Sequence, residues 1–410
     1  MAEKAPSTVH TWRISIGFFV LFIVSFIFAY VGVPSLGEMS IDGAASPATT
    51  TPIERVTHVA TPPAVKGIYM TACIASNKAL RSKLVSLINE TEINTVVIDV
   101  KSFDGYLSFV PEDTKLAPYT GGDCVVSDMK EFIETLHAHD IYVAGRVAVF
   151  QDGLKVKLRP ELAVKKNSDR TVVWRDHKGI PWIDAGAKDH WDYIVSVAKS
   201  AYAIGFDEIN FDYIRFPSDG NMKDIYYPWS DGKKKSDVIE SFFAYLKKSL
   251  EGTGIVMSAD IFGMTTTNTD DLNIGQVLEK ALPYFDYISP MVYPSHYPYN
   301  FNNAGDPNKD PYGVVHYSMS EAVRRAVATT TPIQTLGSTL VSTTTTPWLY
   351  SKPVWDAHKL RPWLQDNNYP VKYTAEMVRA QIQATYDAGL TSWMLWNAGN
   401  RYTREALLTE

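Results

Sequence analysis

Three aspartates stand near the ends of short β-branched runs, where parallel strands commonly place catalytic side chains. They are Asp99 in NTVVIDVKS, Asp212 in FDEINFDYIRF and Asp260 in GIVMSADIFG. Two carboxyl groups that flank a glycosidic bond can hydrolyse it when one is protonated and the other is ionised. These residue types and positions make carboxylate chemistry on a sugar the first hypothesis.

The alternation of side chains along these runs separates apolar residues from polar ones. One face carries the polar residues Asp99 and Lys101, then Glu208, Asn210 and Asp212, then Ser258 and Asp260, and the same rule adds Arg146 of IYVAGRVAV. A charge that faces inward is costly unless it is paired or hydrated. We therefore expect these side chains to meet inside the fold and the three aspartates to line one cavity. A purely structural ion network of Asp99 and Glu208 with Lys101 and Arg146 is the alternative.

Further candidates lie just beyond the ends of other runs. Tyr293 and His296 occur in MVYPSHY, Trp396 and Asn397 end TSWMLWNA, and Trp182 lies in KGIPWID. Aromatic rings at a mouth of this kind are typical platforms for sugars. The alternatives are an ordinary polar loop histidine at 296 and a tryptophan at 396 that plugs a core.

Eight β-branched runs alternate with amphipathic helical patterns after residue 64, which predicts a (β/α)8 TIM barrel of class α/β. The helical patterns include DMKEFIETLHAH, HWDYIVSVAKSAYAIG, DVIESFFAYLKKSLEG and AEMVRAQIQATYDAG. Gly205, Gly254 and Gly389 follow helices as left-handed caps would. An open doubly wound sheet is less favoured because no glycine-rich first turn is present. The eight runs are 65–75, 94–102, 141–149, 206–216, 254–263, 285–293, 333–340 and 391–398.

The N-terminal region predicts a single transmembrane helix ahead of the barrel. Residues 14–33 form an uncharged apolar run of 20 residues, long enough to span a bilayer. Lys4 and Arg13 precede it, so residues 1–13 should be cytoplasmic and the barrel extracytoplasmic, on the cell membrane. Residues 34–63 contain 19 Pro, Gly, Ala, Ser or Thr, as a linker would, and 64–410 form the barrel domain. A cleaved signal peptide is the main alternative.

Composition excludes several other classes of function. A net charge of −6 argues against nucleic acid as a partner. The nine histidines are scattered and no dinucleotide or phosphate-binding glycine motif follows a strand, so we expect neither a metal nor a cofactor, and a metal-dependent hydrolase is disfavoured. The two cysteines, Cys73 and Cys124, could form one disulfide outside the cytoplasm or stay unpaired.

Several motifs resemble a bacterial family of glycoside hydrolases with alpha-amylase-like barrels. They are FDEINFDYIRFP, SADIFG, FDYISPMVYPSHY, KGIPWID, RPWLQD and GLTSWMLWNA, spread over residues 65–402. The resemblance implies a TIM barrel, a carbohydrate substrate and a nucleophile at the end of strand 4, where Asp212 stands. The acid/base that follows strand 5 in amylase-like barrels is commonly Glu, whereas Asp260 stands there in this chain.

The sequence thus predicts a glycosidase that cleaves an extracytoplasmic polysaccharide or cell-wall glycan. Asp212 is the expected nucleophile and Asp260 the expected acid/base, with Glu208 or a loop residue as the alternative acid. A non-catalytic glycan-binding or envelope-organising barrel is the alternative function. The expected substrate-binding residues are Asp99, Lys101, Arg146, Trp182, Glu208, Arg215, Tyr293, His296, Trp396 and Asn397.

Overall fold

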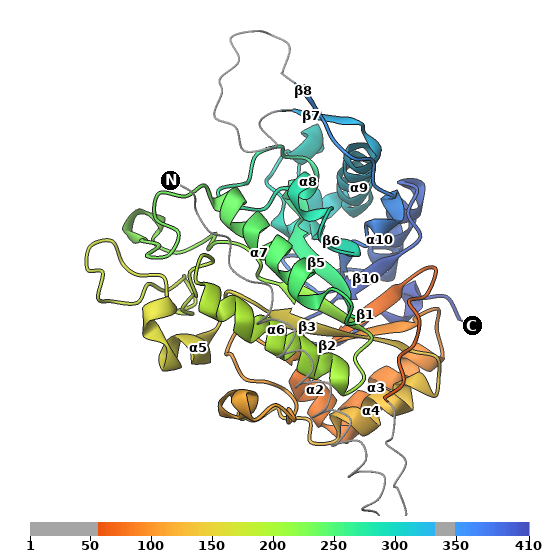
Figure 1. Ribbon diagram of the computed structural model, residues 1–410. Helices are drawn as coiled ribbons and strands as arrows, with labels where there is room; N and C mark the ends of the chain where they lie inside the picture. Colours follow the sequence, from red (N-terminus) through yellow and green to blue (C-terminus); the bar gives the residue numbers. More distant parts are fainter. Residues whose placement is uncertain (1–55, 333–348, 410) are drawn as a thin grey trace, which may run out of the picture. The chain divides into compact units, whose positions relative to one another are not determined.

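Eight parallel strands close into a barrel in the computed structural model, which describes residues 56–332 and 349–409 (Figure 1). Their order around the barrel is β1-β10-β9-β6-β5-β4-β3-β2. The strands are β1 (Lys66–Met70), β2 (Thr95–Lys101), β3 (Tyr142–Ala148), β4 (Glu208–Asp212), β5 (Val256–Phe262), β6 (Tyr287–Met291), β9 (Trp363–Gln365) and β10 (Trp393–Trp396). The predicted TIM barrel is confirmed.

Helices follow the strands and surround the barrel (Figure 1). Gly205, Gly254 and Gly389, which follow α6, α7 and α10, all have positive φ, as their role as helix caps predicts. The helices are α2 (Ala72–Ser76), α3 (Lys78–Asn89), α4 (Met129–His137), α5 (Gly153–Leu158), α6 (Lys188–Ala203), α7 (Lys235–Leu250), α8 (Leu278–Ala281), α9 (Pro311–Val327) and α10 (Ala375–Asp387).

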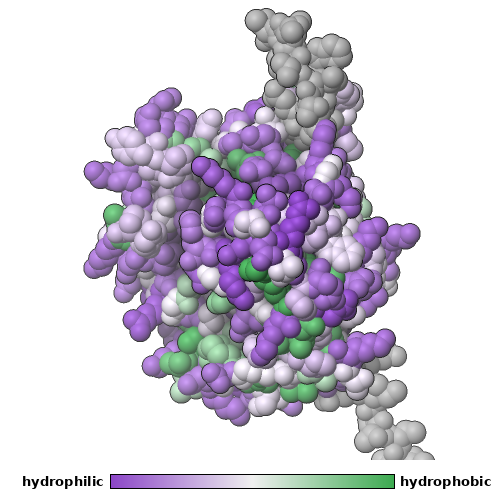
Figure 2. Space-filling model, turned by 90° about the vertical axis from the view of Figure 1, so that its left-hand side faces the viewer, coloured by the Kyte–Doolittle hydropathy of each residue, from purple (hydrophilic) through white to green (hydrophobic). Residues whose placement is uncertain are grey.

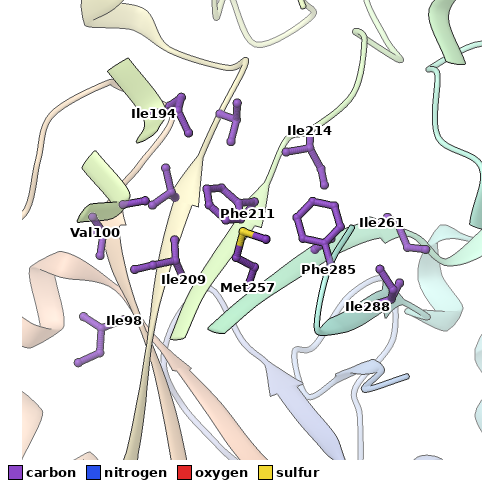
Figure 3. Packing of buried hydrophobic residues seen from close by; sticks show 14 of the residues in the cluster. Ile98, Val100, Ile194, Ile209, Phe211, Ile214, Met257, Ile261, Phe285 and Ile288 are labelled. Atoms are coloured by element: carbon purple, nitrogen blue, oxygen red, sulfur yellow. The ribbon is translucent and has the colours of Figure 1, made fainter. Parts of the chain in front are cut away.

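The main hydrophobic core lies between the strands and these helices, and it is built from the apolar parity of each strand. Ile98, Ile209, Phe211, Met257 and Ile261 belong to it, and Figure 3 shows them packed together. A second, smaller cluster takes the opposite parity and includes Tyr69, Val97, Tyr293 and Trp363. The separation of the two faces that the sequence predicts is therefore confirmed in β4, in β5 and in β2 as far as Asp99.

The barrel strand between β6 and β10 was assigned to the wrong segment of the chain. The run at 333–340 lies outside the described residues, and the place between β6 and β10 in the barrel is filled by β9. The residues that flank 333–340 form a separate antiparallel pair, β7 (Thr330–Pro332) with β8 (Leu349–Ser351). Because β9 has only three residues, it shows no alternation from which a strand could be recognised.

The N-terminal predictions fall largely on residues that the structure does not describe. The run at 14–33 is outside the described residues, and no helix among those that are described is long and apolar enough to cross a membrane. Residues 56–63, expected to belong to the linker, instead contact the barrel domain. The Val59 amide donates to Asp207 Oδ1 at 2.7 Å, and the His58 ring stacks on Tyr202 with 3.9 Å between centroids.

The two cysteines are paired. A disulfide joins Cys73, in α2, to Cys124, in the long connection after β2. It ties the first two βα connections together at one side of the barrel. The face of the molecule drawn in Figure 2 is mostly hydrophilic, with small hydrophobic areas scattered over it.

Candidate active site

A buried arginine joins two of the three aspartates. Arg146 Nη1 donates to Asp99 Oδ1 at 2.7 Å, while its Nη2 and Nε donate to Asp212 Oδ2 at 2.6 and 3.0 Å. Asp99 is 3% exposed and Asp212 6% exposed. The strands set this geometry, because Asp99 of β2 pairs in register with Arg146 of β3, and β4 lies directly alongside β3. The same network also holds Tyr69 of β1, whose hydroxyl donates to Asp99 Oδ2 at 2.5 Å.

The backbone after β4 supplies a further donor to Asp212. Tyr213 has a φ of +54°, in the left-handed region that non-glycine residues seldom adopt. Its amide donates to Asp212 Oδ1 at 2.6 Å. Asp212 therefore has a cation on one carboxylate oxygen and a backbone N–H on the other.

The third aspartate, Asp260, lies in a different environment. Its Oδ1 accepts hydrogen bonds from Asn210 Nδ2 and Trp363 Nε1, both at 2.8 Å, and it forms no ion pair within the described part of the chain. Asp260 is 2% exposed. Burial, and then the negative charge of Asp212, raise the pKa of Asp260 well above its usual value. Both donors reach Oδ1, so the proton of the neutral acid belongs on Oδ2.

The charge balance of the cluster also affects Asp99. Burial raises the pKa of Asp99, although Arg146 and the Tyr69 hydroxyl act against that shift. Arg146 pairs with Asp99 and Asp212 but not with Asp260, and a third negative charge beside this pair of carboxylates would be unfavourable in a medium of low dielectric constant. Burial and the neighbouring negative charge therefore favour the neutral acid at Asp260.

Aromatic rings border the charged cluster. Tyr69 stacks on Trp396 with 4.2 Å between ring centroids, and the Trp363 ring meets Trp396 edge-on at 5.8 Å. Tyr293 lies 6.4 Å from Trp396. Burial, followed by the charges of Asp260 and Asp212, raises the pKa of Tyr293 well above its usual value. Acidic groups and aromatic rings are therefore neighbours in this cluster.

Two residues expected at this site lie elsewhere. Glu208 is four residues before Asp212 on β4, about 13 Å lower along the strand, where it pairs with Arg361 at 2.8 Å. Lys101 follows a register shift in β2, and its Nζ contacts the Ala148 carbonyl at 2.5 Å and Asp152 at 2.8 Å. The parity rule assigned Lys101 to the wrong place because the register shift after Asp99 redirects its side chain.

The remaining expected residues surround the mouth without joining the cluster. Trp182 is buried, and its Nε1 donates to Asp176 at 3.0 Å. The side-chain amide of Asn397 donates hydrogen bonds from Nδ2 to the backbone carbonyls of Asp366 and Arg401. His296 is exposed, and its ring meets Tyr293 edge-on at 5.3 Å.

Three residues of the cluster were not named as site residues from the sequence: Tyr69, Trp363 and Asn210, although Asn210 was assigned to the inward face. Asn210 shares the parity of Asp212, and Tyr69 lies in the first predicted strand, so both could have been named. Trp363 lies in the motif RPWLQD, but it was not placed on a strand because the seventh strand was assigned to 333–340. Among the described residues, no group of three or more His, Cys, Asp or Glu has the arrangement of a metal site.

Solved structures similar to this chain share its barrel. One is the glycoside hydrolase domain of PgaB (BpsB) from Bordetella bronchiseptica, with 12% identity, a TM-score of 0.55 and coverage of 82% of this chain and 94% of that one. Another is alpha-L-fucosidase isoenzyme 2 from Paenibacillus thiaminolyticus, with 10% identity, a TM-score of 0.51 and coverage of 84% and 47%. At such identities the likeness concerns the fold alone.

A hypothetical protein from Ruminiclostridium thermocellum ATCC 27405 is 34% identical over 47% of this chain and 96% of its own, with a TM-score of 0.42. No protein of curated function matches the chain. The model of the family described as "Putative glycosyl hydrolase domain" matches residues 67–402, which include every strand of the barrel from β2 to β10 and all but the first residue of β1. The chain therefore belongs to this glycosyl hydrolase family.

Proposed function

We propose that the protein hydrolyses a glycosidic bond of an extracytoplasmic polysaccharide or cell-wall glycan, with Asp212 as nucleophile and Asp260 as proton donor. The observation that carries the proposal is the contrast between the two carboxyl groups. Asp212 is bound by Arg146 and a backbone amide, whereas Asp260 has only neutral donors and a raised pKa. Such a contrast assigns the acid and the base in a carboxylate pair.

The steps follow from these environments. Asp260 gives the proton on Oδ2 to the glycosidic oxygen as the bond from that oxygen to the anomeric carbon breaks. An oxygen of Asp212 bonds to the anomeric carbon, forming a glycosyl ester. Water then attacks the same carbon, returns a proton to Asp260 and releases Asp212. Retention of the anomeric configuration is the expected stereochemical outcome.

Two features support an extracytoplasmic location for this activity. The Cys73–Cys124 disulfide suits an oxidising compartment. The apolar run at 14–33, outside the described residues, would anchor the domain to the membrane.

The experiment compares Asp212→Asn with Asp260→Asn on two substrates of the same sugar: a natural oligosaccharide and an activated aryl glycoside. A panel of bacterial and plant glycans, screened for released reducing ends, first supplies the sugar. Asp212→Asn should abolish turnover of both substrates. Asp260→Asn should slow the natural substrate by about 10²–10⁴-fold and the activated one far less, because its leaving group needs no proton.

Asp231→Asn, on an exposed residue, is the matched control and should leave both rates unchanged. Equal losses on the activated substrate would refute the assignment of roles. Binding without turnover across the whole panel would favour the alternative of a glycan-binding barrel.

A further inference from the structure

Arg215 is a buried cation at the edge of the active-site mouth, three residues after Asp212. It is 8% exposed. Its guanidinium carbon lies over the rings of Trp182, Tyr213 and Phe262, at 4.9, 5.2 and 4.5 Å from their centroids. These rings come from the connection after β3, the end of β4 and the end of β5, so Arg215 lies at the C-terminal face of the barrel, close to Asp212.

Arg215 differs from every other buried arginine in the described residues. Arg146, Arg325 and Arg361 each pair with at least one carboxylate at 2.8 Å or closer. No carboxylate of residues 56–332 or 349–409 lies within 4.0 Å of Arg215. A buried charge without a partner is costly in a folded protein, and it persists at functional sites where a ligand supplies the opposite charge.

Most of the donors of Arg215 are unused. Its Nη1 donates to the Phe216 carbonyl at 3.0 Å and to Ser218 Oγ at 3.2 Å. Within the described chain, Nε and Nη2 donate no hydrogen bond. The planar fork of a guanidinium fits the two oxygens of a carboxylate, and stacked rings hold that fork in a fixed orientation.

The nearby acidic residues do not serve as its partner. Asp176 accepts hydrogen bonds from Gln151 and Trp182, both on Oδ2, and Asp212 is bound by Arg146. Asp219 is exposed. These charges lie near enough to favour the charged form of Arg215, although burial lowers its pKa.

We propose that Arg215 binds a carboxylate of the glycan, so that the substrate is an acidic polysaccharide whose carboxylate lies beside the bond that is cleaved. The carboxylate comes either from a hexuronic acid or from a lactyl ether such as that of muramic acid. This inference deepens the proposed function and rests on it for the position of the bond, but carboxylate binding itself can be measured without turnover.

The test measures binding by calorimetry to the full-length chain carrying Asp260→Asn, which slows hydrolysis while leaving residue 215 intact. The first pair of ligands is an oligo-hexuronate and the same oligosaccharide with its carboxylates reduced to alcohols. The second pair is a peptidoglycan glycan strand with free lactyl carboxylates and the same strand with those groups amidated. Each pair is measured with Arg215, Arg215→Lys and Arg215→Gln.

At least one acidic ligand should bind about 10- to 100-fold more tightly than its neutral counterpart when Arg215 is present. The preference should vanish with Arg215→Gln and be reduced with Arg215→Lys, which keeps the charge but loses the fork. Arg170→Gln is the control, since Arg170 also stacks on a ring, 3.8 Å from the Tyr226 centroid, and is exposed. It should leave the preference unchanged.

Equal binding within both pairs, no binding of either acidic ligand, or a preference that survives Arg215→Gln would overturn the proposal. The comparison between acidic and neutral ligands needs no variant at 215, so it can still be made if Arg215→Gln does not fold. Acid-selective binding that depends on Arg215, without hydrolysis by the wild type, would refute only the proposed function. Hydrolysis of neutral glycans with no effect of Arg215 would refute only this inference.

Discussion

Asp260→Asn should raise the free energy of unfolding of the barrel at neutral pH. The carboxyl group is 2% exposed, and its Oδ1 accepts from Asn210 and Trp363. An asparagine can keep its oxygen in the place of Oδ1 and put its amide where the protonated Oδ2 of the acid lies. The substitution therefore imitates the neutral acid and cannot ionise.

The size of the effect follows from proton linkage. The pKa of Asp260 is raised on folding, so above pH 3.8 the unfolded carboxyl group ionises while the folded one keeps its proton. The wild type then loses stability as pH rises towards the folded pKa, by at most about 1.4 kcal/mol per pH unit for one proton. The stability difference between Asp260→Asn and the wild type should grow over that window and become constant above it.

Urea unfolding of residues 56–410, which form one compact unit, measures this difference at intervals from pH 4 to pH 9. Asp231→Asn is the control, and its free energy of unfolding should change with pH as that of the wild type does. A difference that does not change with pH, or a variant that becomes less stable than the wild type as pH rises, would contradict a raised pKa at Asp260.

Three further predictions concern other parts of the chain. Arg146→Met should lower the free energy of unfolding by about 3–5 kcal/mol in urea titrations, because two buried carboxylates lose their cation, and neutralising both carboxylates as well should recover part of the loss. Cys73→Ser opens a loop with a sequence separation of 51 and should cost about 4 kcal/mol by the same assay, with one free thiol then detected. Protease added to intact cells should remove the barrel while residues 14–33 stay in the membrane, whereas full protection of the barrel, or a mature N-terminus near residue 34, would contradict this topology.

The sequence was enough to predict which residues lie on each face of a strand, because the alternation of side chains is a local property of the chain. Alternation with a period of two depends only on the backbone of each strand, so Asp99, Asp212 and Asp260 could be assigned to the interior before any pairing was known. The eightfold alternation of strands and helices likewise indicated the barrel. The same local rule failed at Lys101, where a register shift in β2 breaks the period.

The different environments of the carboxyl groups were decided only by the tertiary structure. Arg146 and Asp212 come from strands 66 residues apart in sequence, and Trp363 and Asp260 from strands 103 residues apart. Whether a carboxyl group is ionised depends on which of these partners reach it and on how much water they exclude, and neither quantity can be read from a single strand. That no carboxylate of the described residues pairs with Arg215 has the same origin, since this can be known only when the neighbouring side chains are in place.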